Sequence, residues 1–230
     1  MIKLRATWNL PAGAPPEPIA EAYLESHLPA VRSLPGLRRH NLLSFIRDPS
    51  GGPPAWWRGE ELYFDDVAAL DVAAASEAWS RAWGGPFGAG IAGPRFHAFV
   101  VDEEFRPIPA ASSAEGSGEI TALSGIWQVP AQKLPEEVDA VYLDVHVPGV
   151  RALPGLRCHT VMRAVEWPSG EIPRAWRSAE IRFASQADFD AAFSTPQYEG
   201  IRSDGFNASV AGPDVDIYSV VEEWTDGPGA

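Results

Sequence analysis

Cysteine and long apolar segments are both scarce in this chain of 230 residues. Its single cysteine, Cys158, excludes a disulfide framework and a cysteine metal cluster, which suits a protein of a reducing compartment. No stretch approaches the roughly 20 apolar residues of a membrane-spanning helix. The segment Met1–Pro18 also lacks the apolar core of a signal peptide. We therefore expect a cytoplasmic protein.

Basic residues are also few, because 18 Lys and Arg stand against 31 Asp and Glu, which gives a formal net charge of -13. Nucleic acids and anionic membranes both need a basic face, so we expect neither as a partner. The five histidines show no metal-ligand spacing. Gly88 to Gly93 spell the dinucleotide motif, but they lead into Pro94 and a strand rather than into a helix. We expect no metal and no cofactor.

Apolar residues are plentiful, at 45% with nine Trp, so the chain can bury a substantial core. The main pattern is an internal repeat, in which Tyr23–His40 returns as Tyr142–His159. The offset is about 119 residues and holds without a gap through most of the chain. That period is too long for a solenoid unit and is typical of two copies of a domain of about 100 residues.

A linker between the copies is predicted from a run of small residues and prolines without apolar periodicity. We place it at residues 106–119. The first domain then covers residues 1–105 and the second covers residues 120–226.

Each copy has the pattern strand, helix, strand, strand, helix, strand, which is the ferredoxin-like plan. The strands expected in the first copy are 2–10, 38–46, 58–64 and 95–101, with helices from 15 to 34 and from 67 to 79. In the second copy we expect strands near 122–129, 157–167, 179–183 and 216–221.

The predicted fold class is α+β, with two ferredoxin-like domains packed sheet to sheet as an intramolecular α+β barrel. Such a chain would be a monomeric pseudo-dimer, and a homodimer of these chains stays open. The reason for this packing is that each sheet has one face without helices, and the other copy can cover it.

The repeated run His-x-Pro-x-Val-Arg-x-Leu-Pro-Gly-Leu-Arg, which begins at His27 and at His146, resembles the EthD family of the dimeric α+β-barrel superfamily. In the first copy it is followed by Trp57–Phe64 and an alanine-rich helix, which strengthens the resemblance. This similarity covers most of both halves and therefore implies a tandem EthD protein. It implies a small cofactor-independent enzyme acting on an aromatic, polyketide-like or lactone intermediate, as a cyclase, isomerase or dehydratase. A cofactor-free monooxygenase is a subsidiary option.

Repeated histidines and glutamates are the predicted acid and base groups. His27 flanks the apolar stripe of its helix, and His40 shares a strand face with apolar neighbours. A carboxylate that orients a histidine raises its basicity. We therefore expect Glu61 to pair with His40 or His27. The alternatives are histidines with a purely structural role and glutamates in ordinary ion pairs. The predicted catalytic residues of both copies are His27, His40, Glu61, His146, His159 and Glu180.

A small hydrophobic or aromatic ligand is the predicted partner. Tryptophans offer flat apolar walls, and arginines can hold a phenolate or carboxylate, although core packing and helix capping explain the same residues. The predicted substrate-binding residues are Tyr23, Arg32, Trp57, His97, Tyr142, Arg151 and Trp176.

The two copies differ at several predicted pocket positions. Trp83 corresponds to Arg202, and His97 corresponds to Asp216. We favour the first copy as the active one, because it keeps more aromatic residues and an additional histidine. The alternative function is a non-catalytic small-molecule-binding or accessory protein of a catabolic or biosynthetic pathway. A structural relic of duplication is a third reading.

Overall fold

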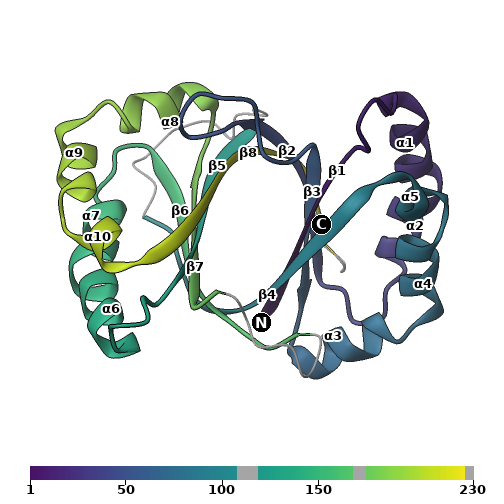
Figure 1. Ribbon diagram of the computed structural model, residues 1–230, viewed down its shortest axis with the longest axis horizontal. Coiled ribbons are helices and arrows are strands. Elements are labelled where there is room, and N and C mark those ends of the chain that lie inside the picture. Colours follow the sequence, from purple (N-terminus) through teal and green to yellow (C-terminus); the bar gives the residue numbers. More distant parts are fainter. Residues whose placement is uncertain (108–118, 168–174, 226–230) are drawn as a thin grey trace.

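The computed structural model describes residues 1–107, 119–167 and 175–225. Eight antiparallel strands form a closed barrel, and helices lie outside it on two opposite sides (Figure 1). The order around the barrel is β1-β3-β2-β8-β5-β7-β6-β4, and β4 returns to β1. The strands are β1 (Ile2–Asn9), β2 (Arg39–Arg47), β3 (Arg58–Phe64), β4 (Ala92–Phe105), β5 (Ile120–Gln128), β6 (Leu156–Ala164), β7 (Arg177–Phe183) and β8 (Ala211–Thr225).

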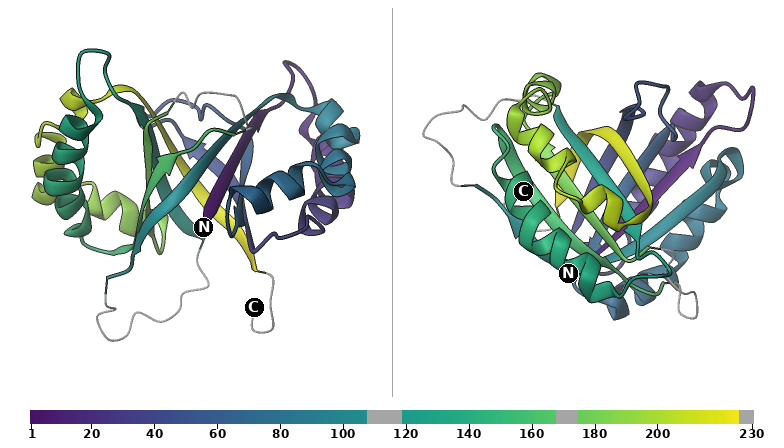
Figure 2. Two further views of the ribbon diagram at one scale, coloured as in Figure 1. Left: turned by 90° about the horizontal axis from the view of Figure 1, so that it is seen from below. Right: turned by 60° about the vertical axis from the view of Figure 1, so that its left-hand side comes forward.

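The helices form one group for each half of the chain, and Figure 2 shows the two groups on either side of the barrel. The first group is α1 (Pro16–Ala22), η1 (Tyr23–His27), α2 (Leu28–Arg32), α3 (Val67–Ala74), α4 (Glu77–Gly84) and α5 (Pro86–Gly90). The second is α6 (Pro135–Val141), η2 (Tyr142–His146), α7 (Val147–Arg151), α8 (Gln186–Ala192), α9 (Pro196–Arg202) and α10 (Phe206–Ser209). Within the described ranges, no helix combines the length and the apolar content that a bilayer crossing would need.

The predicted arrangement of two ferredoxin-like domains packed sheet to sheet as an intramolecular α+β barrel is wrong. The order of strands and helices along each half agrees with the prediction, but the two sets of strands do not stack face to face. Instead β4 pairs with β1 of its own half and with β6 of the other, and β8 pairs with both β5 and β2. The two sets of four strands therefore join edge to edge, which closes the sheet and leaves it without a free edge.

The lengths of β4 and β8 explain the error. These strands have 14 and 15 residues, whereas we expected only the segments 95–101 and 216–221. Their added ends carry charged residues, Asp102 to Glu104 and Glu222 to Glu223, which are poor strand formers in isolation. Pairing across the two halves overrides that local preference.

Smaller differences concern one helix and the domain limits. The helix expected over residues 67–79 is two helices, because the Ser76 hydroxyl accepts a hydrogen bond from the Trp79 amide at 3.2 Å and so caps α4. Most of the predicted linker, residues 108–118, and the predicted end of the second domain at residue 226 lie outside the described residues. The domain limits stay a prediction.

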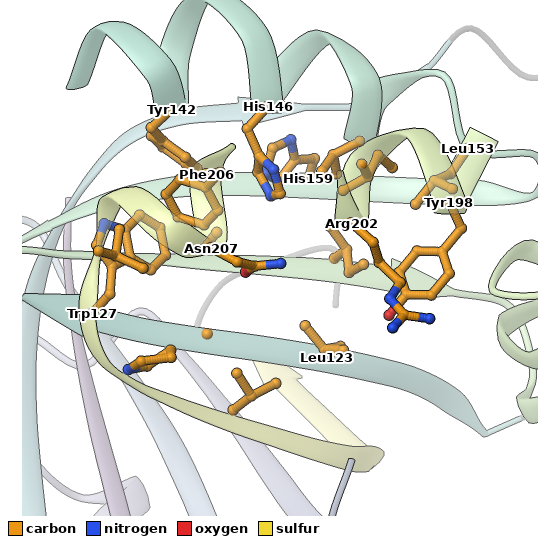
Figure 3. A pocket seen from close by; sticks show the side chains of 18 of the residues that line it. Leu123, Trp127, Tyr142, His146, Leu153, His159, Tyr198, Arg202, Phe206 and Asn207 are labelled. Carbon is orange, nitrogen blue, oxygen red and sulfur yellow. The ribbon is translucent and has the colours of Figure 1, made fainter. Parts of the chain in front are cut away.

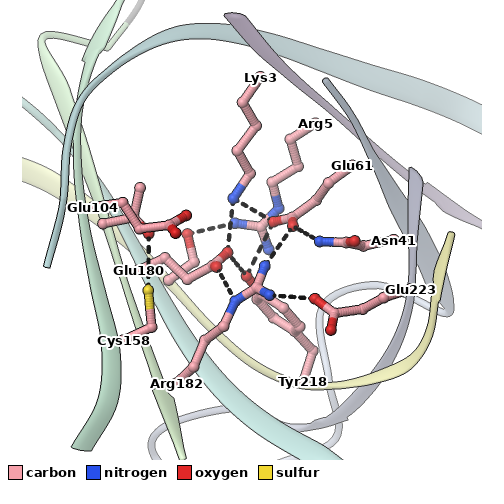
Figure 4. Close-up of polar contacts among 12 residues, drawn as sticks. Lys3, Arg5, Asn41, Glu61, Glu104, Cys158, Glu180, Arg182, Tyr218 and Glu223 are labelled. Carbon is pink, nitrogen blue, oxygen red and sulfur yellow. Dashed lines mark hydrogen bonds and ion pairs between the residues drawn. The ribbon is translucent and has the colours of Figure 1, made fainter. Parts of the chain in front are cut away.

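Alternate residues of each strand face the helices or the inside of the barrel. In β1, Leu4 belongs to the apolar core under the first helix group, whereas Lys3 and Arg5 point into the barrel. Figure 4 shows that polar side chains from both halves meet there. The Lys3 ammonium lies 2.7 Å from Glu180 and also contacts Glu61. Residues of the two halves thus form ion pairs with each other inside the barrel.

Opposite charges are matched within this barrel network. Arg182 lies 2.5 Å from Glu180 and 3.1 Å from Glu61, and the Tyr218 hydroxyl lies within hydrogen-bond distance of both carboxylates. Burial alone would raise the pKa of Glu180, but Arg182 and Lys3 hold it well below its usual range. Buried pairs of this kind add little net stability, because the cost of removing the charges from water offsets their attraction.

Candidate functional site

The two repeated histidines each end a π-helical turn, Tyr23–His27 and Tyr142–His146. A proline follows each turn at the second position, and its missing N–H and bulky ring disturb the helix four residues earlier. The helix is wider at this turn, because the Leu28 amide donates to the Tyr23 carbonyl five residues earlier. In the second half, the Val147 amide donates to the Tyr142 carbonyl in the same way. The ring centroids of Tyr23 and His27 lie 5.1 Å apart as a result.

In the first half, His27 and His40 share one carboxylate. His27 Nδ1 donates to the Ala82 carbonyl at 3.0 Å, and its Nε2 lies 3.2 Å from Glu60 Oε1. His40 Nε2 lies 2.9 Å from the other oxygen of Glu60. All three of these side chains are completely buried.

This geometry fixes a proton between His27 and Glu60. A carbonyl only accepts, so Nδ1 of His27 carries a hydrogen, and Nε2 facing a carboxylate needs a second one. The pair is therefore a buried charge-assisted hydrogen bond. Burial would raise the pKa of Glu60, but His27 and the hydrogen bonds from both histidines lower it to about 2.

Aromatic rings occupy the space around His27. The ring centroid of Phe87 is 4.1 Å from that of His27, and Trp83 is 4.7 Å away with its ring edge-on. Trp8 and Tyr23 complete this enclosure. The histidine of the first half thus lies in a packed core.

The second half contains a cavity of about 180 Å³ between its helices and the sheet (Figure 3). It lies where the first half is packed, because Ala179 replaces the buried Glu60 and Arg202 replaces the indole of Trp83. Its apolar wall includes Leu123, Ile181 and Phe206, and its polar groups include Tyr142, His146, His159, Arg202 and Asn207. The pocket therefore combines an apolar wall with a few polar side chains, as small-molecule sites do.

His146 is oriented by Asp204. Its Nδ1 lies 2.7 Å from the Asp204 carboxylate, so Nδ1–H donates and Nε2 is left to face a ligand. Asp204 precedes Gly205, whose φ of 87° allows the turn between α9 and α10. Burial lowers the pKa of His146, and Asp204 only partly opposes it. The imidazole is consequently neutral near neutral pH and can accept a proton.

His159 is the second histidine of the pocket. Burial, together with the Arg151 charge, lowers its pKa to about 3, so it is neutral. Its Nδ1 has no hydrogen-bond partner among the described residues, and the same holds for Nδ1 of His40. This unpartnered nitrogen is a shared feature of the two halves and does not by itself indicate a ligand.

The predicted pairing of Glu61 with His40 or His27 is wrong, because both histidines contact Glu60 instead, and the catalytic roles predicted for Glu61 and Glu180 stay predictions. Both glutamates lie inside the barrel, in contact with Lys3 and Arg182. One position along a strand reverses the face of the sheet, and Glu60 faces the helices. The alternation Glu60, Leu62, Phe64 was a usable signal, because it places Glu60 on the apolar face. No signal pointed to Asp204, since its counterpart is Gly85.

Three of the predicted residues, Tyr142, His146 and His159, line the pocket together. It lies in the second half, although we favoured the first. Tyr23, His27 and His40 belong to the packed core of the first half, with Tyr23 against His27. Their catalytic or binding roles stay predictions.

The remaining predicted ligand residues lie away from this pocket. Arg32 contacts Glu222, and Arg151 lies 2.7 Å from Glu103, so each arginine joins its helix to the long strand of the other half. Trp57 packs near Trp8, to whose carbonyl its amide donates at 3.1 Å. The last two are Trp176, which donates to Asp139 at 3.1 Å, and His97, whose ring stacks on Phe99 at 6.1 Å.

No protein-family model and no curated protein sequence matches the chain. Among solved structures, an anthrone oxidase-like protein is 17% identical with a TM-score of 0.69, and the match covers 100% of this chain and 94% of that one. A variant of chlorite dismutase from Candidatus Nitrospira defluvii is 11% identical with a TM-score of 0.63, over 96% of this chain and 91% of that one.

An EthD family protein from Bacillus halodurans is 23% identical over 43% of this chain and 95% of its own, with a TM-score of 0.38 that is too low to support an argument. The tandem EthD assignment therefore stays a prediction. What the comparisons show is that this chain shares its fold, over nearly its whole length, with the anthrone oxidase-like protein and with chlorite dismutase.

Proposed function

We propose that this chain is a small cofactor-independent enzyme of the tandem EthD type, which transfers a proton on an aromatic, polyketide-like or lactone substrate. The observation that carries the proposal is the His146–Asp204 contact of 2.7 Å at the wall of an otherwise largely apolar cavity. A carboxylate-oriented neutral histidine is a common general base.

The reaction begins with transfer of a proton from the substrate to Nε2 of His146. An acidic C–H next to a carbonyl, or a phenolic O–H, would supply that proton. The imidazolium that forms is stabilised by Asp204, which keeps its own charge throughout. In an isomerisation, the same proton returns to another substrate atom. In a cyclisation, the carbanion attacks a carbonyl carbon of the same substrate, the C=O π bond breaks, and the new alkoxide takes the proton. In a dehydration, the C–O bond to a neighbouring hydroxyl breaks as the C=C bond forms, and the hydroxyl takes the proton and leaves as water.

The fold shared with an anthrone oxidase-like protein is compatible with this chemistry. An anthrone is an aromatic ketone with an acidic C–H, and removal of that proton gives an electron-rich carbanion. A cofactor-free oxygen-using enzyme would need the same first step, so that subsidiary option shares the base proposed here.

The second candidate is a non-catalytic small-molecule-binding or accessory protein. It is supported by the apolar character of most of the wall, which includes Leu123, Ile181 and Phe206. A pocket of this kind binds flat hydrophobic molecules without any chemistry. The two candidates differ in whether His146 changes a rate or only an affinity.

The test is deuterium exchange at the acidic C–H of 2-tetralone, an enolisable bicyclic ketone, followed by proton NMR in D₂O. The wild type should accelerate exchange, and His146→Gln should lower that acceleration on the order of 10²-fold or more. His27→Gln is the matched control in the first half and should retain the acceleration, with its folding checked by circular dichroism.

Two outcomes would count against the enzyme. His146→Gln exchanging at the wild-type rate would remove the proposed base. A wild type that binds 2-tetralone without accelerating exchange would favour the binding protein.

A further inference from the structure

The pocket has two separate polar ends. Figure 3 shows His146 and His159 close together on one side, and Arg202 beside Tyr198 on another. Leu123 lies opposite them, on the strand β5 that forms the sheet side of the pocket. A ligand that places its reacting atom at His146 would therefore extend toward Arg202.

The charge of Arg202 is only weakly engaged. Its side chain lies in the last turn of α9, is 61% exposed, and meets Glu199 three residues earlier at 3.4 Å. An exposed pair of this kind contributes little and is easily exchanged for another partner. By contrast, Arg151 lies 2.7 Å from Glu103, and Arg177 is held by Asp139 and Asp102.

The comparison with the first half points to the same end of the pocket. Trp83, the counterpart of Arg202, has its ring 4.7 Å from His27 and 4.8 Å from Phe96. A neighbouring position changes in the same direction, since Trp79 becomes Tyr198, which lies beside Arg202 in Figure 3. At this end, the half that holds the cavity thus has a cation and a hydroxyl where the other half has two indoles.

We infer that the substrate of this pocket carries an anionic group, a carboxylate or an ionised phenol, which Arg202 binds while the reacting end lies at His146. This inference rests on the proposed function, because it names the substrate class of the same site. A guanidinium matches a carboxylate with two parallel hydrogen bonds.

The overall charge of the protein does not attract an anion. Its formal net charge is -13, and two carboxylates lie near the site, Asp204 bound to His146 and Glu199 beside Arg202. Selection of an anion has to come from a local cation. On binding, the ligand takes the place of Glu199 at Arg202, and Glu199 turns to solvent.

The experiment compares two probes of the same shape, 2-naphthoate and its uncharged methyl ester, by isothermal titration calorimetry at neutral pH. Wild-type protein should bind the naphthoate more tightly, and added salt should weaken that preference. Arg202→Met should weaken naphthoate binding by about tenfold or more and change ester binding less than about twofold. Arg202→Lys should keep part of the preference, because it keeps the charge without the fork.

Arg81→Met is the matched control. Arg81 is an exposed arginine of α4 in the first half, 3.7 Å from Glu77, so its loss changes the net charge equally but leaves the pocket intact. Equal affinity of the wild type for both probes, no detectable naphthoate binding, or equal losses for both probes in Arg202→Met would each overturn the inference.

His146→Gln separates this inference from the proposed function. It should keep the preference for naphthoate while losing the acceleration of exchange. If the preference holds but the wild type accelerates no exchange, the anion site stands and the enzyme is refuted. If exchange depends on His146 but the preference is absent, the enzyme stands and the anion site is refuted.

Discussion

The equivalent histidines of the two halves have different partners and different surroundings. His27 and His146 occupy equivalent π-helical turns, yet the first bonds to Glu60 inside a packed core and the second bonds to Asp204 at the wall of a cavity. The carboxylate comes from the sheet in one half and from a loop in the other. The difference teaches that the partner and the neighbouring volume, rather than the histidine itself, decide whether this position is packed in a core or faces a cavity.

Side-chain volume separates the halves as much as charge does. Ala179 in the second half replaces Glu60, and Arg202 replaces the ring that Trp83 places against His27. A smaller side chain on the sheet and a polar one on the helix leave room for a ligand. Each of the following changes tests one part of this contrast.

Removing the carboxylate of the first half should give the largest effect. Glu60→Ala leaves a buried histidine pair without its acceptor, and we expect a loss of about 3–5 kcal/mol in the free energy of unfolding. Urea denaturation followed by tryptophan fluorescence measures it. Glu77→Ala, at an exposed glutamate of α4, is the control and should change stability by less than about 0.5 kcal/mol. A Glu60→Ala protein as stable as the wild type would mean that the first-half cluster is not a structural ion pair.

Acid should unfold the protein partly through Glu60. Its pKa is about 2 in the folded protein against an ordinary 4.5, so the unfolded chain takes up this proton first as the pH falls. The associated stability is present above about pH 4.5 and is lost toward pH 2, with a magnitude on the order of 3 kcal/mol. Urea midpoints of the wild type and of Glu60→Gln between pH 5 and 2.5 should therefore converge. Curves that stay parallel over this range would contradict the assignment.

Creating a cavity in the first half should lower the free energy of unfolding less than removing its buried carboxylate does. Trp83 is half-buried, so Trp83→Ala should lower the free energy of unfolding by about 2–3 kcal/mol, whereas Arg202→Ala should change it by less than about 0.5 kcal/mol. Thermal or urea denaturation compares the two variants directly. Equal effects would show that the equivalent positions are packed alike, and the contrast between the halves would fail.

The smallest expected effect is a shift along the pH axis. Neutral His146 is the proposed base, so the exchange rate should fall as the pH drops through its pKa, which burial places below the ordinary 6.5. Asp204 raises that pKa, so Asp204→Asn should move the acid limb of the pH–rate profile to still lower pH. An acid limb that moves to higher pH in Asp204→Asn would contradict the role given to Asp204. His27→Gln should leave the limb in place.

The two carboxylates that contact the histidines differ in whether strand alternation in the sequence can predict them. The faces of β3 follow from the alternation Glu60, Leu62, Phe64, which pairs Glu60 rather than Glu61 with the histidines. Asp204 could not be found in this way, because it lies in a turn whose position depends on how α9 packs. Predicting it would have required the distance between two segments far apart in the chain.

The sequence alone determined the duplication, the order of strands and helices in each half, and the recurrence of histidine before proline on a helix. These features depend on local preferences and on periodicity, which a chain carries in every conformation. Only the tertiary structure decided that β4 and β8 close the barrel, that Glu61 and Glu180 lie inside it, and that the cavity lies in the second half. Those outcomes depend on which distant strands pair and on which side chains compete for the same volume, and neither is encoded within one local segment.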